Sequence, residues 1–298
     1  MKVILPFALL LLSSGVSRAQ QVPEFLDYKE KLRLSEESLN QGSLDTNRFN
    51  QYKASLAEDK TNRKVRVHTL PTSTKVQSAT ARYEENKHKT YVAGLLYKAP
   101  DATNWSLYGM ATAFAISEDG YLASNQHVVE ELDKNPIYKG TANENLPCFF
   151  VAIDFDGRVY PVQEISTYNK EADLAIFKIN TDGKKISAFS LGEVARVGEE
   201  VFVLSHPSQN YYYLSQGIVN KNAGNAKDPM QDRTYISADY SVGSSGGPIF
   251  DDKGNIVSVV SQTGTLGVPI NGNRDNINVQ MILKLTMPVH LLKTLITP

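Results

Sequence analysis

Residues 237–261 read SADYSVGSSGGPIFDDKGNIVSVVS, and this stretch decides how the rest of the chain is interpreted. Ser245 has glycines nearby on both sides, and glycine lets a backbone approach a bound molecule closely. An activated serine needs this freedom, because backbone N–H groups must point at the charge that develops on the attacked carbonyl oxygen. Ser245 is therefore a candidate nucleophile.

The residues after the candidate serine predict a β-hairpin. Pro248 opens the apolar run PIF, and the turn at residues 252–255 separates this run from NIVSVVS. From about Thr90 onward, similar short apolar runs alternate with turn signals such as Asp119-Gly120. Many short strands at this spacing predict an antiparallel barrel or sandwich rather than an α/β sheet.

Two further residues complete a candidate catalytic group. His127 follows the strand-like run YLAS and precedes two valines, so it can be held rigidly at a cleft. Asp173 opens the apolar run LAIFKI, where a carboxylate is costly to bury without a partner. His127 would be that partner by donating its Nδ1 hydrogen. The three residues in the order His, Asp, Ser indicate a catalytic group far more specifically than any one of them does.

Four segments together resemble the chymotrypsin-fold (trypsin-like, S1-type) serine proteases, and within them the bacterial high-temperature-requirement or Deg-type proteases. The similarity covers about residues 92–298 and does not cover residues 20–90. The segments are GMATAFAISEDGYLASNQHVV at 109–129, EADLAIFKI at 171–179, GEEVFVLSHPSQNYYYLSQGIVN at 198–220 and the opening stretch at 237–261.

The resemblance implies an all-β fold of two six-stranded antiparallel β-barrels, which meet near residues 180–200 and follow a partly helical N-terminal extension. It also implies a serine endopeptidase that hydrolyses peptide bonds of protein or peptide substrates through an acyl-enzyme. Ser245 would attack, His127 would transfer the proton and Asp173 would orient the histidine. The backbone N–H groups of Gly243 and Ser245 would form the oxyanion hole. Neither a metal nor an organic cofactor is implied.

The sequence departs from the family pattern in two places. Ser244 stands where the family usually has Asn or Asp, so activation by a new N-terminus that pairs with that acid is not expected. Only 53 residues follow Ser245 (298 − 245), which leaves no room for the PDZ domain that Deg-type proteases often carry.

The sequence says little about which bond is cut. In chymotrypsin-like layouts the base of the specificity pocket lies six residues before the nucleophile, which is Asp239 here. A carboxylate in that place would favour Arg or Lys in the substrate. Deg-type proteases instead favour small aliphatic residues and unfolded chains, and the favoured interpretation of Asp239 is a solvated or structurally hydrogen-bonded residue.

Two other functions stay open at this point. The triplet Gly243-x-Ser245-x-Gly247 formally matches the nucleophile elbow of an α/β-hydrolase-type esterase, for which Asp275 and His290 could complete a triad. That fold needs a helix after the serine, whereas Pro248 predicts a strand. A catalytically inactive protease fold that acts as a binding or chaperone module is the second alternative.

The N-terminus predicts export. Lys2, the ten-residue apolar run at 3–12 and the small residues before a cleavage site after Ala19 make residues 1–19 a signal peptide. Cys148 is the single cysteine and precedes an apolar run, so it is expected to be buried and no intrachain disulfide is possible. Export without disulfides favours the bacterial periplasm or secretion from a bacterium.

The charge balance and the distribution of apolar residues limit the kinds of partner this chain can have. The 31 basic and 32 acidic residues give a net charge of −1, which argues against a nucleic-acid partner. No later segment is long and apolar enough to span a membrane. Residues 20–90 form a polar, partly helical extension, in which residues 71–89 have no clear period and are interpreted as a linker; the protease domain would occupy 91–298. The sequence does not indicate the oligomeric state.

Overall fold

The computed structural model describes residues 27–41, 58–99, 101–134, 148–270 and 273–298. The signal peptide predicted at residues 1–19, with its cleavage site after Ala19, lies outside these residues. Among the described helices, none has the length and apolar character that crossing a membrane requires.

Six antiparallel strands close into a first barrel, in the order β2-β3-β4-β7-β6-β5. Its strands are runs of apolar and β-branched residues joined by tight turns; Gly120, in the predicted turn between β3 and β4, has a φ of +98°, a conformation that glycine adopts without strain. The strands are β2 (Thr90–Tyr97), β3 (Ser106–Ala115), β4 (Tyr121–Ser124), β5 (Cys148–Ile153), β6 (Val159–Asn169) and β7 (Leu174–Ile179).

A second ring of strands follows in the order β12-β9-β10-β11-β14-β13, and a further pairing between β12 and β13 closes it. The two-residue strand β8 (Ser190–Leu191) pairs with the start of β13. The other strands are β9 (Glu200–Ser205), β10 (Tyr213–Ala223), β11 (Arg233–Ile236), β12 (Pro248–Phe250), β13 (Asn255–Ile270) and β14 (Asn273–Pro288).

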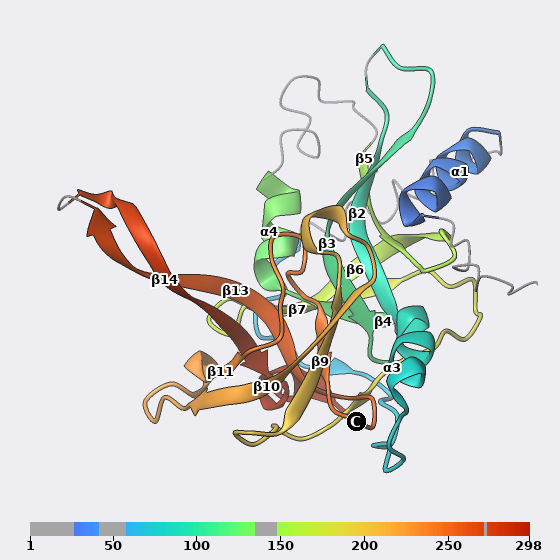
Figure 1. Cartoon of the computed structure of the whole chain (residues 1–298). Helices are drawn as coiled ribbons and strands as arrows, with labels where there is room; N and C mark the ends of the chain where they lie inside the picture. The colour runs from blue at the N-terminus through green and yellow to red at the C-terminus, as the bar shows by residue number, and fades with distance from the viewer. Residues whose placement is uncertain (1–26, 42–57, 100, 135–147, 271–272) are drawn as a thin grey trace, which may run out of the picture.

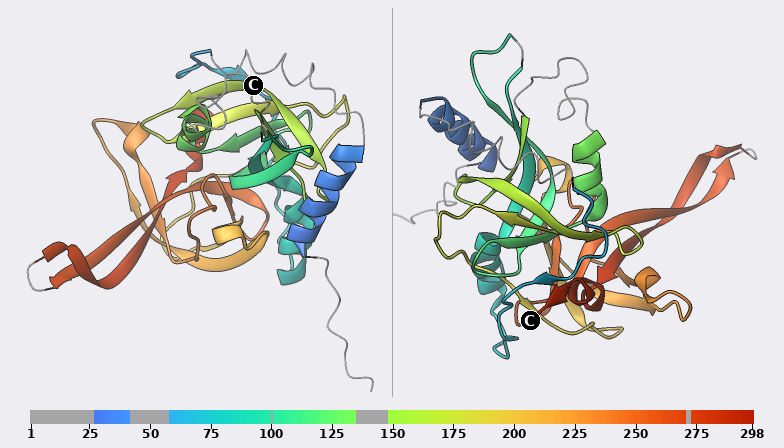
Figure 2. Two further views of the ribbon diagram at one scale, coloured as in Figure 1. Left: turned by 90° about the horizontal axis from the view of Figure 1, so that it is seen from above. Right: turned by 180° about the vertical axis from the view of Figure 1, so that it is seen from behind.

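This architecture confirms the prediction of two antiparallel barrels. The first barrel ends at Ile179 and β9 begins at Glu200, so the connection falls where the sequence placed it. A strand, β12, follows the candidate serine, and the α/β-hydrolase alternative is therefore wrong. One feature is unusual: β13 and β14 continue beyond the barrel as a long projecting hairpin (Figures 1 and 2).

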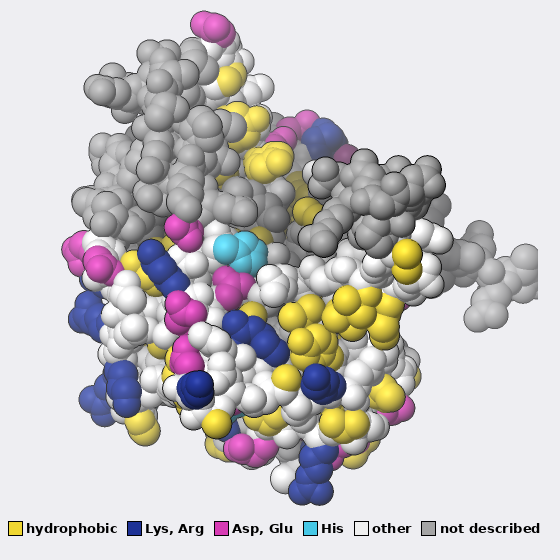
Figure 3. Space-filling model, turned by 90° about the vertical axis from the view of Figure 1, so that its left-hand side faces the viewer, with side chains coloured by type: hydrophobic (Ala, Val, Ile, Leu, Met, Phe, Trp, Pro, Cys, Tyr) yellow, Lys and Arg dark blue, Asp and Glu magenta, His cyan; other side chains and the backbone are white. Residues whose placement is uncertain are grey.

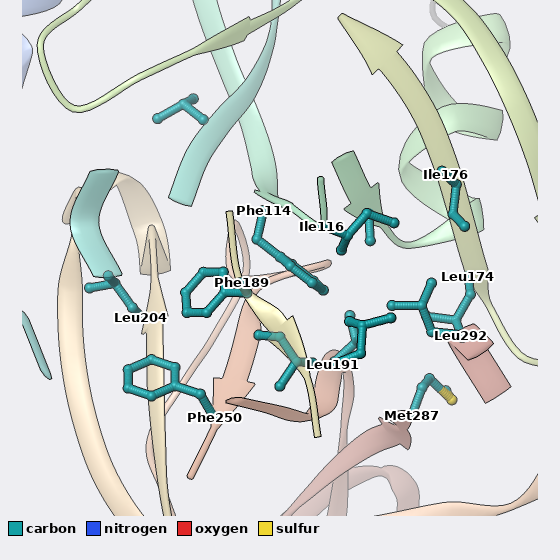
Figure 4. Packing of buried hydrophobic residues seen from close by; sticks show 14 of the residues in the cluster. Phe114, Ile116, Leu174, Ile176, Phe189, Leu191, Leu204, Phe250, Met287 and Leu292 are labelled. Carbon is teal, nitrogen blue, oxygen red and sulfur yellow. The ribbon is translucent and has the colours of Figure 1, made fainter. Parts of the chain in front are cut away.

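Aromatic side chains fill the space between the two barrels. Phe114 from the first barrel lies edge-on to Phe189, which precedes β8, at a ring-centroid distance of 5.9 Å. Phe189 in turn packs on Phe250 of the second barrel at 5.7 Å, and all three rings are buried. Figure 4 shows this cluster with aliphatic neighbours from both barrels. A shared core therefore fixes one barrel relative to the other.

The N-terminal residues pack onto the barrels. The helix α1 (Tyr28–Gln41) lies beside β3, where the Asn40 side chain bonds both the N–H and the C=O of Trp105. Val65 and Val67 belong to the core, and β1 (Val65–Arg66) pairs with β15 (Ile296–Thr297), which follows α6 (Val289–Thr294).

The interpretation of residues 71–89 as a linker is wrong for their second half. Residues Ala79–Asn86 form the helix α3, and Lys87–Lys89 form a short 3-10 turn. Ser78 caps the helix by accepting a hydrogen bond from the Ala81 N–H. The Arg82 guanidinium lies 4.2 Å from the ring centre of Phe202. Contacts with the second barrel therefore stabilise a helix too short to show a clear apolar period.

The buried Phe250 ring offers a test of the shared core. Because it contacts Phe189 and Phe202, the change Phe250→Ala should lower the free energy of unfolding by about 3–5 kcal/mol. Urea denaturation followed by fluorescence measures this loss. Tyr213→Ala, at a half-exposed ring, is the matched control and should cost much less; equal losses would contradict the proposed core.

Candidate active site

His127 and Asp173 lie in direct contact. His127 is in the first turn of the helix α4 (Gln126–Lys134), which begins just after β4 ends. Its Nδ1 atom is 2.9 Å from Asp173 Oδ1 and 3.0 Å from Oδ2. An ionised carboxylate can only accept hydrogen bonds, so Nδ1 carries the hydrogen and Nε2 of the neutral ring keeps its lone pair. This is the tautomer that a general base requires.

Several groups hold Asp173 in place. Its carboxylate also accepts hydrogen bonds from the His127 backbone N–H at 3.1 Å and from the Ser261 hydroxyl at 2.6 Å. The Asn125 side chain donates to its backbone carbonyl. Asp173 has a φ of +49°, a conformation that costs free energy for a residue with a side chain. These contacts offset that cost and fix the carboxylate.

The loop that carries Ser245 is anchored to the first barrel by Thr112 of β3. The Thr112 N–H donates to the Ser245 carbonyl, and the Thr112 hydroxyl donates to the Gly243 carbonyl, both at 2.9 Å. A Cβ atom at Gly246 would lie 2.1 Å from the Ser124 hydroxyl and 2.9 Å from the Asn125 nitrogen. The loop therefore sits directly against the segment that continues into His127.

The peptide between Val242 and Gly243 has a fixed orientation. The Ser208 N–H donates to the Val242 carbonyl, and in a trans peptide the N–H of the next residue points the opposite way. Gly243 has a φ of +92°, and a Cβ atom there would lie 2.5 Å from the His206 carbonyl oxygen. Among the described residues, no acceptor takes the N–H of Gly243 or of Ser245. Both donors remain available to a ligand.

Ser244, which replaces the acid common in the family, is fully buried. Its hydroxyl accepts a hydrogen bond from Ser205 at 2.9 Å, and its N–H donates to the Ser241 carbonyl. A charged side chain could not be accommodated there without a cationic partner. The loop is thus held by neutral hydrogen bonds.

Asp239 and Tyr240 face in opposite directions. The Asp239 side chain is 82% exposed, and its carboxylate lies 3.7 Å from Lys284 Nζ at the surface. The Tyr240 ring is buried, with its hydroxyl 3.0 Å from the Gln262 carbonyl and 2.8 Å from that of Leu285. Burial raises the pKa of Tyr240, so it stays neutral. Tyr240, not Asp239, therefore points inward, toward β13 and β14.

A cavity of about 420 Å³ opens beside Gly243. Its walls combine apolar and aromatic side chains with the backbone of the Ser245 loop, so a substrate side chain could enter it. The lining includes Val92, Tyr108, Ala111, Tyr211, Val242 and Gly243.

Residues 206–212 border this cavity, and their backbone is strained. Ser208, Gln209 and Tyr212 all have positive φ angles between 48° and 63°. His206 anchors the segment from inside, since its Nδ1 atom accepts a hydrogen bond from the Tyr212 N–H at 3.0 Å. Burial lowers the pKa of His206 from 6.5 to about 3, with a hydrogen bond at the Tyr91 backbone partly opposing this shift.

The sequence did not identify Thr112 or Ser261 as residues of the site. Thr112 stands between two alanines of β3, and Ser261 stands between Val260 and Gln262 of β13. A hydroxyl in such a strand is a weak signal that becomes informative only when the strand neighbours are known. His290, the base of the rejected alternative, pairs instead with Asp232 at 3.1 Å, and the side chain of Asp275 lies outside the described residues. No cluster of three or more potential metal ligands occurs among the described residues.

Comparison with known proteins gives one family match. The model of the trypsin-like peptidase domain matches residues 111–259, half of the chain. A probable periplasmic serine endoprotease, DegP-like, from Brucella suis biovar 1 (strain 1330) is 30% identical over 151 residues, which are 50% of this chain and 26% of that protein. Protease Do-like 5, chloroplastic, from Arabidopsis thaliana is 25% identical over 172 residues, 55% of this chain and 51% of that protein.

This chain therefore spans only about a quarter to a half of the length of these curated relatives. Among solved structures, the crystal structure of Deg5 aligns with a TM-score of 0.51 at 18% identity, covering 72% of this chain and 90% of that chain. At this identity the likeness shows a shared fold.

Because His206 is buried, we expect the free energy of unfolding to depend on pH in the acid range. The unfolded chain binds this proton below about pH 6.5, whereas the folded protein does so only near pH 3. The free energy of unfolding should therefore fall as the pH drops from 6.5 toward 3. His206→Asn should flatten this slope in urea titrations between pH 7 and 4, and the exposed His68→Asn should not. Identical slopes in His206→Asn and the unmodified protein would refute this role.

Proposed function

The chain belongs to the trypsin-like peptidase family, and on this basis we propose that it is a serine endopeptidase whose catalytic triad is His127, Asp173 and Ser245. The observation that carries the proposal is the contact of 2.9 Å between His127 Nδ1 and Asp173 Oδ1 beside the glycine-flanked Ser245 loop. Its substrates are proteins or peptides, and the reaction passes through an acyl-enzyme.

The first step is attack of Ser245 Oγ on the scissile carbonyl carbon. His127 Nε2 takes the hydroxyl proton as the new C–O bond forms, and Asp173 stabilises the imidazolium that results. When the tetrahedral intermediate collapses, His127 gives the proton to the leaving amine and the acyl group stays on Ser245. Water then attacks the ester by the same route and regenerates the hydroxyl.

The N–H groups of Gly243 and Ser245 would stabilise the negative charge that forms on the carbonyl oxygen in the tetrahedral intermediate. Both donors are available in the described structure, and donors fixed in advance stabilise such an oxyanion without reorganisation. The hydrogen bond from Ser208 to the Val242 carbonyl supports this role because it fixes the direction of the Gly243 N–H.

We further propose that the residue preceding the cleaved bond is small and uncharged. Its side chain must lie next to Ser245, between the nucleophile loop and the start of β13. We propose that this space is occupied by the buried ring of Tyr240, five residues before Ser245, whose hydroxyl bonds the Gln262 and Leu285 carbonyls. Asp239 points into solvent, which argues against a preference for Arg or Lys.

Export is also part of the proposal. The residues at 1–19 have the pattern of a signal peptide, and the Brucella relative is described as periplasmic. A bacterial periplasmic or secreted location follows. N-terminal sequencing of the protein recovered from the envelope fraction would test for cleavage after Ala19.

The triad can be tested with an active-site probe and a peptide substrate. A fluorophosphonate should label Ser245, and Ser245→Ala or His127→Ala should abolish labelling. Asp173→Asn should lower kcat by about 10⁴-fold, because His127 would adopt the wrong tautomer. Full proteolytic activity in Ser245→Ala would rule out the mechanism. A well-folded chain that neither labels nor cleaves would indicate an inactive binding module.

The role of Tyr240 predicts a shift in specificity. Tyr240→Ala should open space beside Ser245 and raise kcat/KM for peptides with Leu or Phe before the cleaved bond, relative to Ala, by at least about 10-fold. A peptide-library cleavage profile measures this ratio. Asp239→Ser is the matched control and should leave the profile unchanged. Cleavage after Arg or Lys that disappears in Asp239→Ser would overturn this assignment.

A further inference from the structure

A cluster of aromatic rings joins the helix α1 to the cavity of the candidate active site. Tyr28, the first residue of α1, has its ring centre 4.9 Å from those of both Tyr211 and Tyr212. The His206 ring lies 5.7 Å from Tyr211 and 4.7 Å from Tyr212. Tyr211 lines the cavity, and the other three rings are buried. One residue of the N-terminal extension therefore contacts both tyrosines at the end of the 206–212 segment.

The backbone of the 206–212 segment depends on contacts with its surroundings. Three of its residues have a positive φ and carry a side chain, and such a backbone persists only where neighbouring contacts outweigh the cost. The Tyr212 hydroxyl donates to the Thr90 carbonyl at 3.1 Å. The rings of Tyr28 and Phe155 pack on Tyr212 at 4.9 and 5.0 Å. Side chains from outside the segment thus help to keep it in its strained conformation.

The same segment orients a candidate oxyanion donor. The Ser208 N–H donates to the Val242 carbonyl at 2.6 Å. The His206 carbonyl oxygen would be 2.5 Å from a Cβ atom at Gly243, so the two backbones are in close contact. In the trans peptide between Val242 and Gly243 the N–H points away from the carbonyl. A shift of the 206–212 segment would therefore change the direction of the Gly243 N–H.

The helix α1 is fixed to the first barrel by contacts of its own. The Tyr28 hydroxyl donates to the Asp154 carbonyl at 2.8 Å. The side chains of Lys31 and Ser35 donate to two other carbonyls of the same turn, which lies between β5 and β6. The Tyr28 ring consequently has a fixed place against which the 206–212 segment packs.

The position of α1 shows that its link to the site is indirect. In Figure 1 the helix lies on the right of the barrels, and the projecting hairpin of β13 and β14 lies on the left. Figure 3 shows the hairpin side, where charged and apolar side chains are both exposed. The helix lies away from this face, and the packing of Tyr28 on the two tyrosines connects it with the cavity.

We propose that Tyr28 is a positioning residue for the candidate oxyanion hole. Its ring holds both tyrosines of the 206–212 segment in place, and the segment in turn fixes the direction of the Gly243 N–H. This inference rests on the proposed peptidase function. Tyr28 acts by packing and touches neither the substrate nor the reacting atoms. The N-terminal extension is then part of the working enzyme rather than an inert spacer.

A purely structural role for Tyr28 predicts a different outcome. Loss of a buried ring lowers the free energy of unfolding, and this reduces the amount of folded enzyme without changing kcat per folded molecule. A positioning role lowers kcat itself, because the transition state loses stabilisation of its oxyanion while substrate binding changes little. Kinetics normalised to the folded enzyme, measured by circular dichroism, separate the two roles.

The first test compares full-chain variants on one peptide substrate. Tyr28→Ala should lower kcat by at least about 10-fold, with little change in KM, because one oxyanion donor is misdirected. Tyr28→Phe keeps the ring and should retain nearly all of kcat. An unchanged kcat in Tyr28→Ala, or an equal loss in Tyr28→Phe, would overturn the proposal.

The matched control is at the other end of the same helix. Asn40→Ala removes both hydrogen bonds to the Trp105 backbone and leaves the Tyr28 ring in place. It should lower stability but keep kcat. A loss of kcat equal to that in Tyr28→Ala would assign the effect to the docking of α1 as a whole and overturn the role of Tyr28.

A peptide aldehyde tests the oxyanion hole directly. Ser245 Oγ adds to the aldehyde carbon, the second C–O bond of the carbonyl breaks, and the serine proton moves to His127, which leaves an oxyanion. Tyr28→Ala should raise the inhibition constant of the aldehyde by the factor by which kcat falls. The matching peptide alcohol cannot form this adduct, and its inhibition constant should stay unchanged. Equal weakening of both inhibitors would place the effect in substrate binding and reject the proposal.

The path through the cavity wall is tested with a double variant. Tyr211→Ala removes one of the two rings through which Tyr28 acts. The loss of kcat in the variant that combines Tyr28→Ala with Tyr211→Ala should be clearly smaller than the product of the two single losses, since residues that act through each other are not additive. Fully multiplicative losses would contradict this path.

Hydrogen exchange distinguishes the failure of this proposal from the failure of the proposed function. Mass spectrometry of the full chain needs no catalysis. Tyr28→Ala should speed exchange of the hydrogen-bonded N–H groups of Ser208, Tyr212 and Ser244, and Asn40→Ala should not. Faster exchange, with no labelling or cleavage by the unmodified chain, would reject the peptidase and retain the conformational link. Unchanged exchange, with full turnover by Tyr28→Ala, would reject the link and retain the peptidase.

Discussion

The candidate site depends on the hydrogen bonds that the Asp173 carboxylate accepts. It accepts hydrogen bonds from the ring and the backbone of His127 in the first barrel and from Ser261 in the second. The contact with the ring sets the tautomer, and the contact with Ser261 ties β13 to the seam between the barrels. Asp173 has a positive φ, and these contacts, with the Asn125 side chain bonded to its carbonyl, offset the cost of that conformation.

The barrels are interdependent at the seam. Ser245 belongs to a loop of the second barrel, yet Thr112 of the first barrel bonds two carbonyls of that loop. The close contact of Gly246 with Ser124 brings the loop against the segment before His127. The shared core of Phe114, Phe189 and Phe250 makes this alignment rigid. Neither barrel alone brings together the candidate nucleophile and its candidate base.

The fold and the candidate triad could be predicted from the sequence because their signals are local. Glycines beside Ser245, a histidine at a strand end and a carboxylate at a strand start are each visible within a few residues. The helix α3 and the direction of Asp239 could not be predicted in this way. Contacts with the second barrel stabilise α3, and the hydroxyl of Tyr240 finds acceptors only on β13 and β14.

The sequence by itself determined the all-β class, the strand-rich region after residue 90 and the three residues of the candidate triad. Only the tertiary structure decided which neighbours surround these residues: Thr112 and Ser261 between the barrels, Ser208 behind the Gly243 peptide, and Tyr240 against β13 and β14. It also showed that β13 runs from the contact of Ser261 with Asp173 into a hairpin that projects from the barrel (Figure 1). The physical reason is that the spacing of apolar residues and the residue types that favour turns set local structure over only a few neighbouring positions. The side-chain hydrogen bonds between the barrels join residues 88 and 131 positions apart, Ser261 with Asp173 and Thr112 with Gly243.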